Sequence, residues 1–169
     1  MSVLGDGEEF AYPTFEEQKR LNYLTCVIKE TLRLYPSVPF LPPRELQEDA
    51  VVGGYEIPKK TLLIVDIYSI HHNPKYWKNP DVFDPTRFSE IGEKQHAFAW
   101  LGFGAGTRSC IGQNFSMIEQ RVVLSAILKK FEILLPGEGL ENKELQFRPT
   151  NMLFPEESLK LVFKERIKA

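Results

Sequence analysis

The chain has 169 residues, of which 43% are hydrophobic, 26% charged and 12% aromatic, and its 21 basic and 23 acidic residues leave a formal net charge of -2. This is the composition of a globular domain, which excludes a disordered, collagenous or coiled-coil chain. The balanced charge gives no general field that would attract nucleic acid, so no nucleic-acid partner is expected.

Apolar runs and cysteines predict the compartment. The longest apolar stretch, residues 61–70, is interrupted by Asp66 and is far shorter than the roughly 20 residues that cross a bilayer, so we expect no transmembrane segment. Only Cys26 and Cys110 occur, which excludes a disulfide framework and paired zinc cysteines. No leader segment follows Met1, and we therefore expect a soluble, intracellular chain.

Two long helices are predicted, one in each half of the chain. Thr14 and Glu17 form a capping box that begins a short helix. In residues 22–35 the apolar side chains recur on one arc at about 100 degrees per residue, and Pro36 ends that helix. From about 112 to 131 a second helix has apolar residues around much of its axis, which is typical of a buried helix.

The remaining segments predict short strands and coil. Residues 51–57 and 60–67 are rich in β-forming residues and flank turn-prone glycine and proline, which predicts a small antiparallel sheet. Between 71 and 88 the prolines allow only single helical turns and irregular coil. Apolar residues alternate again over 159–163, so the chain is expected to end on short strands. The predicted class is mainly α with small antiparallel β-sheets, an α+β arrangement.

The clearest chemical signal lies in residues 101–112, LGFGAGTRSCIG, where three glycines and Arg108 precede Cys110 at the start of the second long helix. Glycines let the backbone fold tightly and approach a ligand closely. A thiol among turn amides, the positive end of a helix and an arginine is stabilised as thiolate, the form that ligates metal. A free cysteine is more often a buried core residue, but these neighbours favour a ligand.

Three other interpretations of this loop are a dinucleotide site, a cysteine nucleophile and a zinc site. A dinucleotide-binding GxGxxG needs glycine at its sixth position, which Thr107 and Ser109 occupy in the two registers. A cysteine nucleophile paired with a histidine stays open at this point, although no peptidase signature surrounds Cys110. Zinc is disfavoured because the three histidines of the chain stand at no recognised ligand spacing from that cysteine. These are His71, His72 and His96.

A second candidate cluster begins in the first long helix, where Glu30 and Arg33 occupy neighbouring positions of one face. Such a pair is usually exposed and contributes only a few tenths of a kcal/mol. Glu30 lies on the flank of the apolar arc, however, so a partly buried pair with further partners is the alternative. Arg87, bracketed by aromatic residues and proline in 83–88, is either a third member or an exposed loop arginine.

Together these motifs resemble a known family. Residues 103–112 match, without a departure, the haem-binding signature of the cytochrome P450 family, the haem-thiolate monooxygenases, with its pattern FxxGxRxCxG. Residues 29–36 resemble the family's helix K, and residues 85–88 look like its meander motif. The resemblance implies that residues 1–169 are the C-terminal part of the cytochrome P450 fold, an incomplete single domain. That portion would run from about helix J through helix K, the meander, the cysteine-ligand loop and helix L to the terminal strands.

The resemblance also implies roles around the cofactor. Cys110 would be the proximal axial ligand to the iron of haem b, where a thiolate pushes electron density that favours cleavage of the oxygen–oxygen bond. Phe103, Gly104 and Gly112 would surround the haem and tune that sulfur. No residue of this chain is assigned a catalytic role.

Charged residues would hold the cofactor and the fold. Arg108 and Arg44 would pair with the haem propionates through charge-assisted hydrogen bonds. Glu30, Arg33 and Arg87 would form a structural salt-bridge network on the proximal side of the haem, without a role in the chemistry.

Two apolar segments, residues 37–41 and 151–154, resemble parts of the family that line the distal pocket, with ordinary core packing as the alternative. If they line the pocket, a hydrophobic small molecule is the expected substrate. The candidate lining residues are Val38, Phe40, Leu41, Leu153 and Phe154.

The function that the resemblance implies is that of a monooxygenase that inserts one atom of O2 into an apolar organic substrate. Its electrons would come from an NADPH-dependent reductase, and a full-length relative would be anchored in the endoplasmic-reticulum membrane. Roughly the first two-thirds of a family chain, including the long distal helix with its acid and Thr pair, has no counterpart in these residues. Activity is therefore expected only in a full-length chain. The alternative is a non-catalytic remnant or a haem-binding interaction module.

Overall fold

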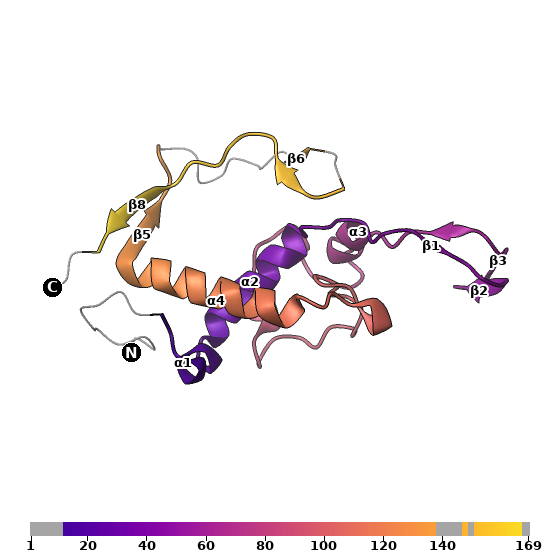
Figure 1. Cartoon of the computed structure of the whole chain (residues 1–169), viewed down its shortest axis with the longest axis horizontal. Coiled ribbons are helices and arrows are strands. Elements are labelled where there is room, and N and C mark those ends of the chain that lie inside the picture. The colour runs from indigo at the N-terminus through magenta and orange to yellow at the C-terminus, as the bar shows by residue number, and fades with distance from the viewer. Residues whose placement is uncertain (1–11, 138–146, 149–150, 167–169) are drawn as a thin grey trace.

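The computed structural model describes residues 12–137, 147–148 and 151–166. Two long helices, α2 (Asn22–Leu34) and α4 (Gln113–Lys130), cross at the centre of the molecule, and the β elements extend to either side of them (Figure 1). None of the helices in the described ranges is long and apolar enough to cross a membrane.

The N-terminal helices follow the local signals in the sequence. Helix α1 (Phe15–Lys19) begins at the predicted capping box, in which the Glu17 amide donates to the Thr14 hydroxyl at 3.3 Å and the Thr14 amide donates to the Glu17 carboxylate at 2.7 Å. Helix α2 ends at Leu34, two residues before Pro36, as predicted. Its buried face carries Cys26 and Ile28 together with two charged residues that belong to the site described below.

Helix α4 has the predicted length but not the predicted burial. It begins and ends within one residue of the expected bounds, yet only Met117, Ser125 and Ala126 are buried. Phe115 is 71% exposed. The expectation of a buried helix is wrong for this structure, because the contacts of α4 with α1, α2 and the following strand leave several of its apolar residues exposed.

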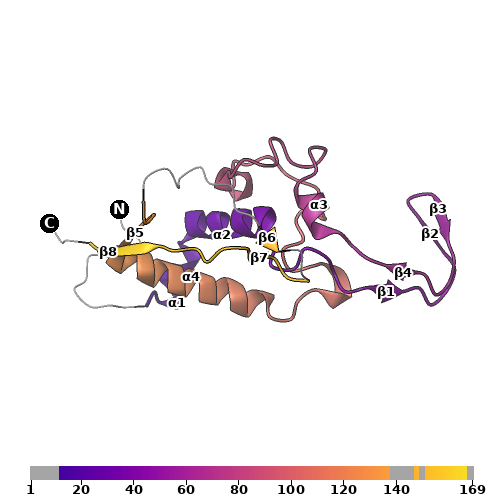
Figure 2. The same cartoon turned by 90° about the horizontal axis from the view of Figure 1, so that it is seen from above.

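The strands β1 to β4, in the first part of the segment between the two long helices, form a projecting arm. Strands β2 (Ala50–Val52) and β3 (Tyr55–Ile57) pair as an antiparallel hairpin, and strand β1 (Arg44–Glu45) pairs with β4 (Leu62–Leu63) closer to the body of the molecule (Figure 2). The hairpin turn needs positive φ at two consecutive positions, which Gly53 and Gly54 supply with +60° and +88°.

The predicted strand over 60–67 is too long. Only residues 62–63 pair as β4, and helix α3 (Ile67–His71) follows after three residues. Asp66 causes this early change, because its carboxylate accepts from the Ser69 amide at 2.9 Å and caps the helix.

The C-terminal residues form two further antiparallel pairs, β5 (Phe131–Leu134) with β8 (Val162–Glu165) and β6 (Phe147–Arg148) with β7 (Phe154–Pro155). The strand predicted at 159–163 begins only at residue 162. The α+β class with small antiparallel sheets is confirmed.

The core lies where α2 meets the long irregular segment that follows α3. This segment contains the short 3-10 helices η1 (Pro85–Phe88) and η2 (Gly106–Arg108) and otherwise turns and coil, as its prolines predict. The largest fully buried side chains of the described residues gather here, and three of them are polar. They are Trp77, Arg33, His71, Glu30 and Pro36.

Candidate functional site

A buried ion pair stands at the centre of this core. The side chains of Glu30 and Arg33 are both 0% exposed, and two parallel hydrogen bonds join them, from Nε of Arg33 to Oε2 of Glu30 at 2.8 Å and from Nη2 to Oε1 at 2.9 Å. This is not the exposed surface pair that the spacing usually indicates. A pair buried in this way stabilises the fold only if its remaining donors and acceptors are also satisfied.

Those partners come from residues 79–88, which we call the meander. Arg87 donates from Nε to Glu30 Oε1 at 3.3 Å, and the Asp84 amide donates to the same oxygen at 2.9 Å. Arg87 also donates to the Asn79 carbonyl at 2.9 Å, and its side chain is 9% exposed. The structure thus brings the three predicted network residues together and adds main-chain groups of the meander.

Arg33 reaches beyond its carboxylate partner. Its Nη1 donates to the His71 carbonyl at 2.8 Å, its Nη2 donates to the Val82 carbonyl at 3.3 Å, and its guanidinium lies 5.2 Å from the centre of the Trp77 ring. One side chain therefore fixes α2, the end of α3 and the meander relative to one another.

Sequence reasoning missed the role of His71, which appeared there only as a possible zinc ligand or base. Its ring is fully buried, with Nδ1 3.0 Å from the Arg33 carbonyl and Nε2 accepting from the Leu101 amide at 2.8 Å. Because Nε2 accepts, the ring proton sits on Nδ1 and donates to that carbonyl. The one sequence signal was its i, i+4 spacing from Ile67, which places both on the buried face of α3.

These contacts also bear on the alternatives for Cys110. Both ring nitrogens of His71 are engaged with the backbone, and His96 Nδ1 accepts from the Phe98 amide at 3.2 Å. Across residues 12–137, 147–148 and 151–166, no histidine forms a hydrogen bond with the Cys110 thiol, and no cluster of three metal-ligating side chains occurs. The geometry therefore supports neither a cysteine–histidine nucleophile nor a zinc site.

Stability is expected to fall as the pH drops from about 6.5 to about 4. Burial, with a smaller contribution from the charge of Arg33 and from His72, lowers the pKa of His71 from 6.5 to about 4. In this window the unfolded chain binds a proton that the folded chain does not, so acid favours unfolding. The loss approaches about 3 kcal/mol at pH 4 because each tenfold difference in proton affinity is about 1.4 kcal/mol.

Urea unfolding at pH 7.0, 5.5 and 4.0 measures this loss, with a His71→Asn chain as the control. The Thr86 hydroxyl lowers the pKa of Asp84 below 3.8, so the contribution of Asp84 is lost at still lower pH. The same pH dependence in both chains would show that His71 is not its source.

The loop that carries Cys110 is closed by its own backbone. The Cys110 amide donates to the Phe103 carbonyl at 2.9 Å, and the Gly104 amide donates to the Leu101 carbonyl at 2.9 Å. Gly104 and Gly106 both have φ of +72°, a conformation that costs a residue with a Cβ about 1–2 kcal/mol. This geometry explains Gly104 and Gly106 as requirements of the turn.

The thiol itself lies on an open face of the molecule. Cys110 is exposed, whereas Cys26 is buried. Gly112 lies just before the first turn of α4, and a Cβ placed on it would be 3.7 Å from the Cys110 sulfur. Ile111 and Phe115 next to it are fully and 71% exposed. An apolar surface with a central thiol fits a flat apolar ligand that binds through its metal.

The two predicted pocket segments lie side by side near this face. The Leu153 amide donates to the Ser37 carbonyl at 3.0 Å, which joins residues 151–154 to residues 37–41. Leu41 lies beside the loop, since a Cβ placed on Gly104 would be 3.8 Å from its Cδ2. Among the remaining candidates, the exposed fraction is 39% to 51% for three residues and intermediate for Leu153. They are Val38, Phe40, Leu153 and Phe154.

The two predicted propionate partners are exposed. Arg108 ends η2, two residues before Cys110, and Arg44 lies in β1 at the base of the projecting arm. Within the ranges that the structure describes, neither guanidinium forms an ion pair. Both can therefore pair with carboxylates of a ligand, so the residues around Cys110 fit haem in polarity, shape and charge.

Comparison with known proteins agrees with this arrangement. The family model described as Cytochrome P450 matches residues 1–163. The human protein Cytochrome P450 4V2 is 44% identical over 143 residues, which are 82% of this chain and 27% of that protein. Cytochrome P450 71B25 of Arabidopsis thaliana is 45% identical over 125 residues, which are 73% of this chain and 25% of that protein.

A solved structure shows the same fold. The crystal structure of a cytochrome P450DA heme domain superposes with a TM-score of 0.84 and 31% sequence identity, over 97% of this chain and 35% of that one. The chain therefore belongs to the cytochrome P450 family, as its motifs predicted, and it spans about a quarter of the length of the curated relatives named above. The cofactor of this family is haem b, whose iron is held by a cysteine thiolate.

Proposed function

We propose that this chain is the C-terminal portion of a haem-thiolate monooxygenase and that Cys110 supplies the thiolate ligand of the iron. The observation that carries the proposal is the placement of Cys110. It is the exposed one of the two cysteines, it follows a turn that only glycines adopt without strain, and it precedes a helix of 18 residues. The thiolate is the form of cysteine that ligates a metal.

The neighbours of Cys110 have separate tasks in this proposal. The Phe103 carbonyl accepts a hydrogen bond from the Cys110 amide and so fixes the backbone that carries the sulfur. Gly104 lets the loop turn, and Gly112 leaves the space beside the sulfur free of a side chain. Arg108 and Arg44 bind the propionates and so orient the haem in its plane.

Haem iron held by a thiolate supplies the cleavage of the oxygen–oxygen bond of O2. In the full protein one oxygen atom enters a C–H bond of an apolar substrate and the other leaves as water, with two electrons from NADPH delivered by a reductase and two protons from solvent. Residues of this chain bind the cofactor and, through Val38, Phe40, Leu41, Leu153 and Phe154, supply part of the apolar wall that excludes water from the substrate.

For the full protein we place the enzyme at the endoplasmic-reticulum membrane. The support is likeness to relatives from animals and plants, together with the apolar substrate that the exposed side chains of residues 37–41 favour.

Reading the transcript upstream of the codon for Met1 tests whether the chain belongs to a complete enzyme. We expect an open reading frame, in frame with this chain, that encodes a long helix with an acid and Thr pair. A stop codon or unrelated sequence directly upstream would contradict the proposal and favour a non-catalytic remnant or a haem-binding module.

A further inference from the structure

Two consecutive residues just before the Cys110 loop are bound to helices, Leu101 to the last residue of α3 and Trp100 to α2. The Leu101 amide donates to His71 Nε2 at 2.8 Å, and Trp100 Nε1 donates to the Lys29 carbonyl at 3.1 Å. The loop begins directly after them, since the Leu101 carbonyl accepts from the Gly104 amide at 2.9 Å. The positions of Trp100 and Leu101 therefore determine where the loop starts relative to α2 and α3.

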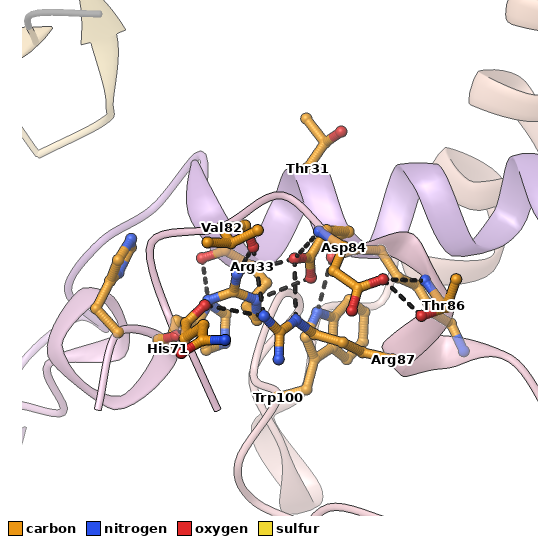
Figure 3. A network of polar contacts seen from close by, with 12 residues as sticks. Thr31, Arg33, His71, Val82, Asp84, Thr86, Arg87 and Trp100 are labelled. Carbon is orange, nitrogen blue, oxygen red and sulfur yellow. Dashed lines mark hydrogen bonds and ion pairs between the residues drawn. The ribbon is translucent and has the colours of Figure 1, made fainter. Parts of the chain in front are cut away.

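The ring of His71 is the link between that position and the buried ion pair. The Arg33 carbonyl lies in the last turn of α2, where carbonyls lack a partner within the helix, and the His71 Nδ1–H donates to it at 3.0 Å. In return, Arg33 Nη1 donates to the His71 carbonyl at 2.8 Å (Figure 3). The histidine is thus held from both sides by one residue of the ion pair.

The contact with Leu101 requires one state of the ring. Only a neutral ring with its proton on Nδ1 has a free lone pair on Nε2, and an imidazolium would turn a second donor toward the Leu101 amide. Burial lowers the pKa of His71 to about 4, which keeps the ring neutral at pH 7.

We propose that His71 is a positioning residue for the Cys110 loop, through which the buried Glu30–Arg33 pair fixes the point where the loop begins. It acts through the Leu101 amide and touches no reacting atom. The relevance to haem rests on the proposed function, whereas the link between α2 and the loop concerns this chain alone.

The first test needs no substitution. In the ¹⁵N-labelled 169-residue chain without haem at pH 7, we expect ring nitrogen shifts of the Nδ1–H form and a coupling across the hydrogen bond between the Leu101 amide nitrogen and His71 Nε2. A proton on Nε2, or an imidazolium, would overturn the proposal because neither can accept from Leu101.

The second test separates the two ring nitrogens. In His71→Asn, the side-chain amide reaches about as far as Nδ1 of the histidine and keeps a donor for the Arg33 carbonyl. In His71→Gln, the side-chain amide reaches about as far as Nε2 and keeps an acceptor for the Leu101 amide. We measure the hydrogen-exchange rates of the Leu101 and Cys110 amides. We expect both rates to rise at least about tenfold in the Asn variant, as loss of one buried hydrogen bond implies, and to stay nearer the native rates in the Gln variant.

Two references make this result specific. The amide of Ile28, in the middle of α2, reports global unfolding, and His72→Asn changes the neighbouring histidine, whose Nδ1 lies 2.9 Å from the Tyr68 carbonyl. If the Leu101 amide exchanged equally fast in the Asn and Gln variants, and faster than in the native chain, His71 would contribute only by filling space. If the Leu101 exchange rate were unchanged in both variants, His71 would not position the loop. Either result overturns the proposal.

The third readout connects the link to the cofactor. In the haem-loaded, reduced chain under carbon monoxide, we expect a smaller fraction of the red-shifted thiolate Soret band in His71→Asn than in His71→Gln. Equal fractions would contradict the effect on the thiolate. If the unsubstituted chain shows no such band, Cys110 does not ligate haem in this chain alone, and the coupling and exchange results still decide whether His71 positions the loop.

Discussion

Replacing Glu30 with alanine is expected to lower the free energy of unfolding by about 3–5 kcal/mol, as is usual when one partner of a buried ion pair is removed. The carboxylate is fully buried and its Oε1 accepts from Arg33, Arg87 and the Asp84 amide at 2.9, 3.3 and 2.9 Å. Without it, two guanidinium groups lose their counter-ion, and the Asp84 amide loses its acceptor. The change is measured by urea unfolding, followed by the fluorescence of the buried Trp77.

A matched control exists in helix α1. Glu16 is paired with Lys19 at the same i, i+3 spacing and at 2.9 Å, but the two side chains are 78% and 57% exposed. We expect Glu16→Ala to change the free energy of unfolding by less than about 0.5 kcal/mol, since solvent screens the pair. If the two variants lost a similar amount of unfolding free energy, burial would not explain the contribution of the Glu30 network to stability.

The second large effect concerns haem affinity. We expect Cys110→Ala to weaken haem binding by at least about a hundredfold, because loss of a residue that merely supports a metal ligand already costs about 10–100-fold. Titration of haem into the chain measures this, followed by absorbance and by quenching of tryptophan fluorescence.

Cys26→Ala is the control for that titration. Cys26 is 6% exposed on the inner face of α2 and has no place in the proposed site, so its replacement should leave haem affinity unchanged. Equal affinity in the Cys110→Ala and unsubstituted chains would contradict the assignment of Cys110 as the ligand.

The elements that the sequence predicted well are those that local signals determine. The capping box at Thr14 and the stop at Pro36 set helix ends through groups only a few residues away. The same holds for the turn-prone pair Gly53 and Gly54, where positive φ is a property of the turn itself, although the hairpin over 50–57 was not predicted.

Burial was harder to predict because it depends on distant segments. The spacing of Glu30 and Arg33 indicated contact between them, but their complete burial depends on a meander whose Asp84 amide is 54 residues from Glu30. The pattern of α4 gave the helix its correct length, while its exposure depends on which faces other elements cover.

The candidate site also contains one residue that a local motif predicted and one that depends on distant segments. A ten-residue motif with required glycines was sufficient to single out Cys110, since the turn and the thiol are contiguous. His71 could not be found by such reasoning, because its partners, Arg33 and Leu101, lie 38 and 30 residues away and are main-chain groups that no residue type reveals.

The most direct measurement of the central claim is the visible spectrum of this chain with haem added, reduced and exposed to carbon monoxide, since the Soret position reports the axial ligand. The account predicts a strongly red-shifted band that is retained in Cys26→Ala and absent from Cys110→Ala. A haem complex without the red-shifted band, or with one that persists in Cys110→Ala, would contradict ligation of the iron by the Cys110 thiolate.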